Sequence, residues 1–301
     1  MHGAVPLLLA TRSWQPTGSL RAQGGQAKTE KVQADAKAKK RIQTRRGIGF
    51  TPIKCHSGQV SLNHARIWYF DVMPRPPRAD EANGLYHALN RGNLRSTIFH
   101  KEGDYAAFEQ ILSEGLRRYS IKLFAYQLMP NHYHLVLRPE MDGEMSRFMK
   151  WVGGTHTMRY HAHYHTAGQG HVYQQRYKSF PIQDDDHFLL VCRYVERNAL
   201  RANLVKRAED WQWGSLYRWT QKREPKPELL SPWPVRRYPN WLERVNEPLS
   251  DNELEAVRRS AQRGQPLGNE NWVEAIARRL NLESTMRPRG RPAKAKPRKQ
   301  T

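Results

Sequence analysis

The stretch Met129-Pro130-Asn131-His132-Tyr133-His134-Leu135-Val136-Leu137 joins a Pro-Asn corner to an apolar run, a pattern typical of a turn followed by a β-strand. Side chains two residues apart on a strand leave the same face, so His132 and His134 are expected to point at one spot. Two adjacent imidazoles supply half of a metal site. Tyr133 is expected to point to the opposite face and to pack there.

Further strands and helices are predicted on both sides of this stretch. Strands are predicted over 85–89, 121–128, 132–137 and 172–182, and helices over 104–119, 145–161 and 187–200. The acidic run Asp184-Asp185-Asp186 supplies an N-cap for the last helix. This order predicts an α+β fold, with a ferredoxin-like sandwich as the closest simple model: an antiparallel sheet with helices on one face.

Tyr194 and Asn198 are four residues apart in the last predicted helix and would share one of its faces. A phenolic oxygen can attack phosphorus once it is activated, and an amide oxygen is a suitable ligand for a hard cation. Each feature also has a structural explanation. A helical tyrosine commonly lies in a core, a His-x-His pair on a surface, and an asparagine in a cap or turn.

Composition indicates the class of partner. The 301 residues contain 50 Lys and Arg against 28 Asp and Glu, a formal charge of +22, which favours a polyanion such as nucleic acid. The charge alone does not distinguish an enzyme from a binding protein. Cys55 and Cys192 form neither a disulfide framework nor a zinc-ligand spacing, which fits a reducing cytoplasm. No apolar run approaches the ~20 residues of a membrane span.

Changes in composition divide the chain into segments. Residues 1–72 lack apolar periodicity and are expected to be disordered, either as a basic arm or as an over-extended gene product that truly begins at Met73. The predicted segments that follow are a patterned catalytic domain over 73–220, a Pro-rich linker over 221–250, a small helical unit over 251–285 and a basic tail over 286–301. The helical unit is either a DNA-reading helix-turn-helix or a C-terminal packing appendage.

The tail contains Arg287-Pro288-Arg289-Gly290-Arg291-Pro292, which resembles an AT-hook core. Arg289 and Arg291 are expected to contact DNA, either in a narrow A·T minor groove or by general attraction to phosphates. Arg91, in the turn after the first predicted strand, is expected to contact DNA as well.

Several segments together resemble a known family. His132-Tyr133-His134 resembles the His-hydrophobic-His motif of the single-tyrosine HUH (IS200-like) transposases, and Arg193 to Ala202 resembles their tyrosine helix. Tyr86-His87 with Asn90 to Asn93 resembles the first strand and turn, and Trp211 to Ser215 resembles the Trp-x-x-Ser-Ser stretch. The similarity covers roughly residues 73–292 and is greatest to the REP-associated tyrosine transposases.

This resemblance implies specific roles. Tyr194 matches the nucleophile that forms a 5′-phosphotyrosine link with single-stranded DNA, and His132, His134 and Asn198 match the ligands of Mg²⁺ or Mn²⁺. The chain departs from the pattern at Ala199, where the family usually has proline, and at Ser215, where relatives tend to have two serines. The first departure directly follows Asn198 and therefore concerns the helix geometry at that ligand.

The implied function is a transposase and endonuclease that cleaves and rejoins hairpin-forming repeat DNA, as a monomer or homodimer associated with the cytoplasmic nucleoid. A domesticated, non-catalytic DNA-binding protein and a basic RNA-binding module are the alternatives. The complete set of Tyr194, His132, His134 and Asn198 favours the enzyme, because a protein that only binds DNA needs none of these residues.

Overall fold

The computed structural model describes residues 79–221 and 225–287, which contain a four-stranded antiparallel sheet. Its strands lie in the order β2-β3-β1-β4, with bounds β1 Leu85–Arg91, β2 Ile121–Met129, β3 His132–Pro139 and β4 Lys178–Ile182. This order and the all-antiparallel pairing are those of a ferredoxin-like sheet. The predicted α+β class is therefore confirmed.

The predicted strand pair around the histidines is a tight hairpin. Pro130 and Asn131 form the turn between β2 and β3, and Met129 pairs with His132 across it. The register places His134 opposite Gln127 in β2 and opposite Leu89 in β1. Strand β3 therefore lies inside the sheet, with a hydrogen-bonded neighbour on each side.

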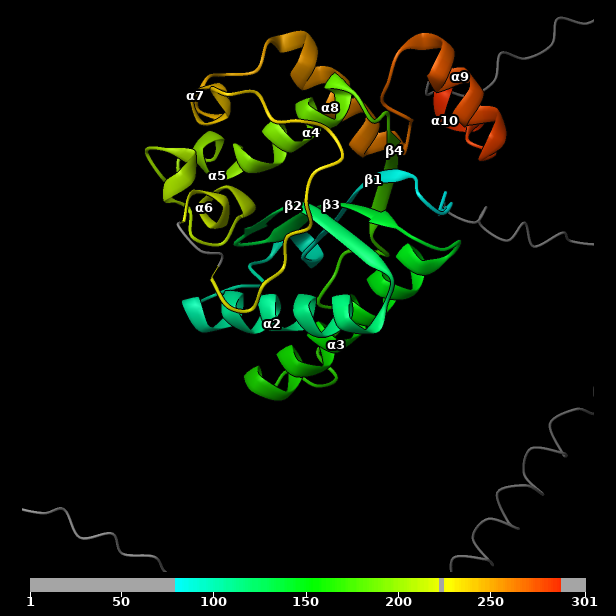
Figure 1. The fold of residues 1–301 in the computed structure, drawn as a ribbon. Coiled ribbons are helices and arrows are strands. Elements are labelled where there is room, and N and C mark those ends of the chain that lie inside the picture. The colour runs from blue at the N-terminus through cyan, green and yellow to red at the C-terminus, as the bar shows by residue number, and fades with distance from the viewer. Residues whose placement is uncertain (1–78, 222–224, 288–301) are drawn as a thin grey trace, which may run out of the picture. The chain divides into compact units, whose positions relative to one another are not determined.

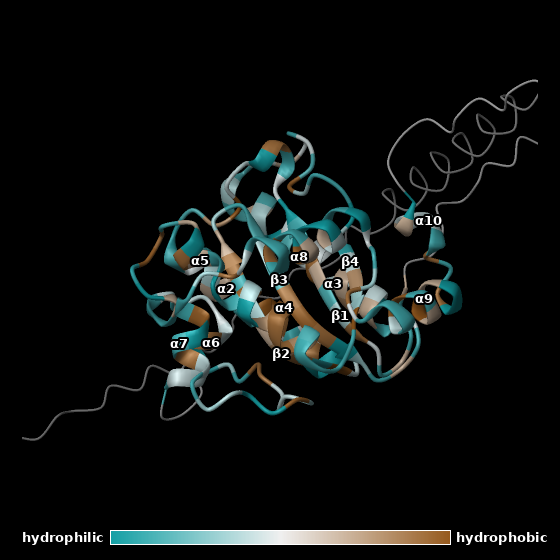
Figure 2. Ribbon diagram, turned by 90° about the horizontal axis from the view of Figure 1, so that it is seen from above, coloured by the Kyte–Doolittle hydropathy of each residue, from teal (hydrophilic) through white to brown (hydrophobic). Residues whose placement is uncertain are grey.

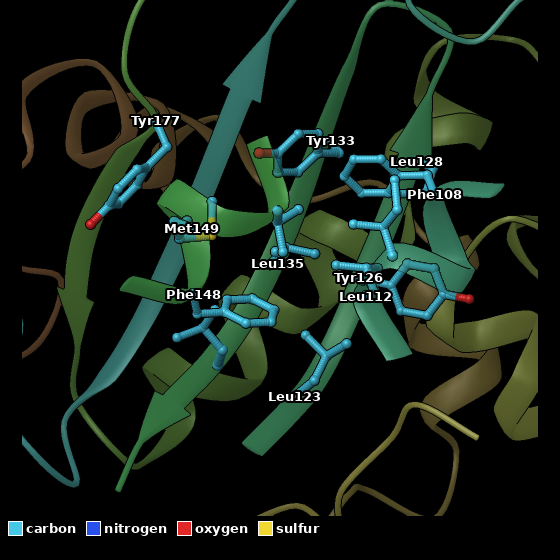
Figure 3. Close-up of a cluster of buried hydrophobic side chains, with 14 of the residues drawn as sticks. Phe108, Leu112, Leu123, Tyr126, Leu128, Tyr133, Leu135, Phe148, Met149 and Tyr177 are labelled. Carbon is cyan, nitrogen blue, oxygen red and sulfur yellow. The ribbon is translucent and has the colours of Figure 1, made fainter. Parts of the chain in front are cut away.

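One face of the sheet is covered by the two crossover helices, α2 (Glu102–Arg118) and α3 (Glu144–Tyr164), as expected. Phe108 and Leu112 of α2 and Phe148 of α3 pack with Tyr133 and Leu135 of β3 (Figure 3). The rings of Phe108 and Tyr133 lie 4.9 Å apart, which confirms that the residue between the two histidines packs on this face.

Helices also cover the opposite face, which the ferredoxin-like model leaves open (Figure 1). On that face α4 (Asp186–Glu196), α7 (Trp241–Asn246) and α8 (Asp251–Arg263) form one buried cluster with Phe124, Val136 and Phe180, in which α7 packs on α4. Figure 2 shows hydrophobic residues concentrated in the sheet and in α4. Apolar burial on both faces explains why the strands are nearly continuous apolar runs rather than alternating ones.

The remaining elements are short. They are η1 (Asn93–Arg95), α5 (Asn198–Arg201), η2 (Ala208–Asp210), α6 (Ser215–Thr220), α9 (Glu270–Arg279) and α10 (Glu283–Met286). The helix predicted over 187–200 is divided at Arg197 into α4 and α5. The predicted acidic N-cap is present, because the Asp185 side chain accepts a hydrogen bond from the His187 amide.

The segment predicted as a linker, 221–250, differs from that expectation in its described part, 225–250. Trp233 donates its indole N–H to the Phe124 carbonyl (2.7 Å), and the Ser231 amide donates to the Leu123 carbonyl (2.7 Å). Trp241 is 1% exposed. Tryptophans among the prolines anchor this segment to the domain, because burying an indole removes a large apolar surface from water. It is part of the domain and not a spacer.

The helical unit predicted over 251–285 begins with α8, which packs against α4 and β4. After α8 the chain runs beside β4, where Leu267 donates its amide to the Pro181 carbonyl and accepts from the Gln183 amide, both at 2.9 Å. Residues 1–72, predicted to be disordered, and Arg289 and Arg291, predicted to contact DNA, lie outside the described residues. Within the described part of the chain, no helix combines the length and apolar character that crossing a membrane requires.

Candidate active site

The two histidines of β3 lie side by side and are buried. His132 is 8% and His134 3% exposed, and their ring centroids are 5.0 Å apart with the planes nearly perpendicular. Both side chains leave the sheet on the face that α4 covers, while Tyr133 leaves on the other. The expected convergence of the two imidazoles is therefore present.

The tyrosine helix crosses above these rings. The Tyr194 ring lies 5.9 Å from the His134 ring, edge to face, and Asn198 Nδ2 lies 2.8 Å from His134 Nε2. The side chains predicted to act together thus gather in one place, from segments about sixty residues apart in the sequence. Tyr194 lies beside the histidines of its own chain.

Sequence reasoning assigned no role to a third histidine, His87 of β1. It is fully buried, its Nε2 lies 2.8 Å from His134 Nδ1, and the two rings stack with centroids 5.0 Å apart. It pairs with Val136 across the sheet, two residues from His134, so its side chain leaves on the same face. A polar residue inside the apolar strand Leu85–Leu89 was the available signal.

The hydrogen bonds decide which nitrogen of each histidine carries its proton. Arg201 donates to Asn198 Oδ1 (2.8 Å), which turns the amide NH₂ of Asn198 toward His134 Nε2. His134 Nε2 then accepts, so His134 Nδ1–H donates to His87 Nε2. The remaining proton of His87, on Nδ1, is buried without a partner among the described residues.

The same logic applies to His132. Asn131 donates its amide NH₂ to the Arg95 carbonyl (3.1 Å), so its Oδ1 faces His132 Nδ1 at 2.6 Å. His132 therefore donates from Nδ1 and keeps the lone pair on Nε2. A histidine that binds a metal through one ring nitrogen commonly donates a hydrogen bond from the other nitrogen, and the group that accepts this bond orients the ring.

The three imidazoles of the site are neutral at pH 7. Burial lowers the pKa of His87 to about 3 and, together with the charges of Arg91 and Arg201, the pKa of His132 to about 3. Burial and the neighbouring histidines hold the pKa of His134 well below its ordinary value. A neutral imidazole is the form that binds a metal ion.

The donor set fits a divalent cation in part. His132 and His134 present neutral imidazoles held by Asn131 and His87, as metal ligands require. Asn198 faces His134 with its NH₂, so its oxygen becomes a ligand only if the amide turns and releases Arg201. Among the residues with described positions, no group of three His, Cys, Asp or Glu side chains could hold a metal.

A cavity of about 300 Å³ opens beside Tyr194 and His134. Four cationic side chains line it, and none of its lining residues is acidic; the cations are Arg91, Lys178, Arg201 and Arg258. Arg91 keeps a buried Nε without a hydrogen-bond partner in the described part of the chain. A cavity with this charge is suited to a phosphate group.

Comparison with known proteins gives a matching family model and similar solved structures. Residues 81–198 match the family model described as transposase IS200 like. One structure, a REP-associated tyrosine transposase bound to a REP hairpin, shares 17% identity over 55% of this chain and 99% of its own, with a TM-score of 0.41. A putative transposase from Deinococcus radiodurans R1 shares 17% identity over 44% and 92%, with a TM-score of 0.30. No curated protein matches.

Proposed function

We propose that the chain cleaves and rejoins single-stranded DNA with Tyr194 as the nucleophile, because residues 81–198 match the family model described as transposase IS200 like. The observation that carries the proposal is the juxtaposition of Tyr194 with His134 inside a cationic cavity. The tyrosine lies on the cavity wall, and none of the residues that the structure describes hydrogen-bonds its hydroxyl. Its oxygen is therefore available to a substrate.

The proposed reaction is a transesterification. The phenolic oxygen of Tyr194 attacks phosphorus, a new O–P bond forms, and the bond from phosphorus to the 3′ oxygen breaks. The phenolic proton passes to solvent, and the departing oxygen gains a proton to become a 3′-hydroxyl. Attack by a 3′-hydroxyl on the phosphotyrosine reverses these steps and rejoins the strand, so the bond energy is conserved in the intermediate.

The chain's own residues contribute position and charge. Arg91, Lys178 and Arg201 surround the cavity and attract the phosphodiester, whose charge grows in the transition state. His132 and His134, with Asn198 after rotation of its amide, would hold Mg²⁺ or Mn²⁺. When bound, such a cation polarises a phosphate oxygen and stabilises the developing charge.

Repeat DNA that folds into hairpins is the proposed substrate, as the resemblance to REP-associated tyrosine transposases implies. Covalent capture distinguishes this proposal from the alternative, a domesticated protein that binds DNA and does not cut it.

The test is incubation of the full chain with a hairpin-forming oligonucleotide and Mn²⁺, followed by a denaturing gel. We expect an adduct that survives denaturation and disappears in Tyr194→Phe, while that variant still binds the oligonucleotide. Tyr238→Phe is the matched control, because it removes a surface hydroxyl bonded to Asp186. Tight binding without an adduct in the unmodified chain would support the non-catalytic alternative, and preference for RNA would support an RNA-binding module.

A further inference from the structure

Helix α8 forms one wall of the cavity beside Tyr194, although it lies outside the segment that matches the family model. The helix begins at a capping box, in which the Ser250 and Glu253 side chains bond each other's amides. It ends at Gly264, which has a φ of 74°, a left-handed conformation that suits glycine. Its length and both ends are thus defined by local interactions.

The position of α8 is tied to the helix that carries the tyrosine. Arg193, next to Tyr194, donates to the Arg244 carbonyl (2.6 Å) and the Pro248 carbonyl (3.0 Å), in the segment that leads into α8. Arg197 donates to the Val245 carbonyl at 3.0 Å. Because residues on both sides of Tyr194 hold this segment, α8 stays beside α4 (Figure 1) and keeps its place relative to the cavity.

Packing decides which face of α8 meets the cavity. Val257 is fully buried and Ser260 is 3% exposed, which fixes the rotation of the helix against α4 and β4. With these residues inward, Arg258, Ala261 and Gln262 line the cavity. Arg258 and Gln262 are four residues apart and therefore occupy one face.

The charge around Arg258 contrasts with that around its neighbour. Arg258 is exposed, and within residues 79–221 and 225–287 no carboxylate pairs with it. Arg259 is exposed too, yet it pairs with Glu255 at 3.2 Å and is not among the residues that line the cavity. Bringing several guanidinium groups around one cavity without a counter-charge is unfavourable until an anion enters.

We infer that Arg258 binds the DNA backbone phosphate that Tyr194 attacks, an inference that rests on the proposed function for the identity of the substrate. A guanidinium can offer two parallel N–H groups to two phosphate oxygens, which fixes the orientation of the phosphate. Gln262 lies one turn farther along the same face and adds a neutral donor. The helical unit after the family domain thereby supplies part of the active site.

The experiment compares Arg258→Gln and Arg258→Lys with the control Arg259→Gln. Binding is measured first, by fluorescence anisotropy of a labelled single-stranded hairpin oligonucleotide at several salt concentrations, with Tyr194→Phe added to every variant to prevent turnover. The logarithm of the DNA-binding constant falls linearly with the logarithm of the salt concentration. Loss of one phosphate contact on single-stranded DNA makes this slope less steep by about 0.7. For Arg258→Gln we expect this change in slope and a roughly tenfold weaker affinity for DNA. For Arg258→Lys we expect about half that loss of affinity. For Arg259→Gln we expect neither change.

Single-turnover cleavage at saturating DNA, with Tyr194 present, then locates the contact. A lower rate that saturating DNA does not restore supports the inference. Equal affinity and slope for Arg258→Gln and Arg259→Gln would overturn it, as would a fully restored rate, since the contact would then lie away from the reacting phosphate. If the unmodified chain forms no adduct, the proposed cleavage fails while the binding comparison still decides whether Arg258 contacts a phosphate.

Discussion

At the scale of single residues, the arrangement depends on hydrogen bonds that fix neutral imidazoles. His87 accepts from His134, and Asn131 accepts from His132, so each histidine of the pair is oriented from its far nitrogen. Arg201 orients Asn198 in turn. Three polar residues that were not predicted as site residues therefore orient the predicted metal ligands. They are His87, Asn131 and Arg201.

Replacement of His87 tests this arrangement. His87→Phe keeps an aromatic ring in place but removes the acceptor for His134 Nδ1–H, so the affinity for Mn²⁺ is expected to fall by about 10–100-fold. Isothermal titration calorimetry of the DNA-free protein measures it. His132→Ala is expected to remove binding altogether.

The matched control for His87→Phe is His156→Phe, which replaces another buried histidine on the other side of the sheet. It should leave Mn²⁺ affinity unchanged. Equal Mn²⁺ affinity in His87→Phe and the unmodified chain would mean that His87 only fills space.

At the scale of elements, buried polar links connect helices that the sequence order separates. Arg218 of α6 pairs with Glu109 of α2 at 2.6 Å and also donates to the Tyr126 hydroxyl. It bonds the Pro225 carbonyl at 2.7 Å as well, which helps hold the segment after α6 against the domain. One guanidinium thus joins two helices, a strand and a loop.

Breaking this link should be costly. Arg218→Met leaves the Glu109 carboxylate buried without its partner, so the free energy of unfolding is expected to fall by about 3–5 kcal/mol. Lys122→Met removes one partner of the exposed pair Lys122–Glu140 and should cost less than about 1 kcal/mol. Urea unfolding followed by circular dichroism measures both. Similar losses for the two variants would contradict a structural role for the buried pair.

At the scale of the whole molecule, the sheet has an apolar layer on each side, and the site lies between the sheet and the second layer. The chain after β4 builds that layer through α4, α7 and α8. The layer excludes water from His87 and His134, which explains their lowered pKa values. The stability of the fold and the neutrality of the site therefore have one cause, burial.

Burial of histidines on both sides of the sheet predicts acid sensitivity. Burial lowers the pKa of His156 to about 4, against a smaller opposing effect of Asp104. In the unfolded chain His156 binds a proton below its ordinary pKa of about 6.5, whereas in the folded chain it binds this proton only below about pH 4. The free energy of unfolding therefore decreases as the pH is lowered through that window, by about 1.4 kcal/mol per pH unit for this histidine alone.

Urea unfolding at pH values between about 4.5 and 7 measures this slope. His156→Phe should reduce the slope without abolishing it, because His87 and His132 contribute in the same direction. An unaltered slope in His156→Phe would contradict the prediction.

Features that depend on local periodicity could be predicted from the amino-acid sequence. Alternation along a strand paired His132 with His134, helical spacing paired Tyr194 with Asn198, and the order of strands and helices indicated the α+β class. The Pro-Asn corner and the acidic N-cap also follow from short-range chemistry, because each concerns residues within one turn of each other.

Which of these pairs meet, and which residues surround them, depends on contacts between distant segments of the folded chain. His87, the packed segment 225–250 and Arg258 join the domain or its site through contacts between residues far apart in sequence. The break at Arg197 and the second helical layer have the same origin. Such contacts arise when apolar faces on separate elements are buried together. The hydrophobic periodicity of an element shows which of its faces is buried, but not which other element packs against that face.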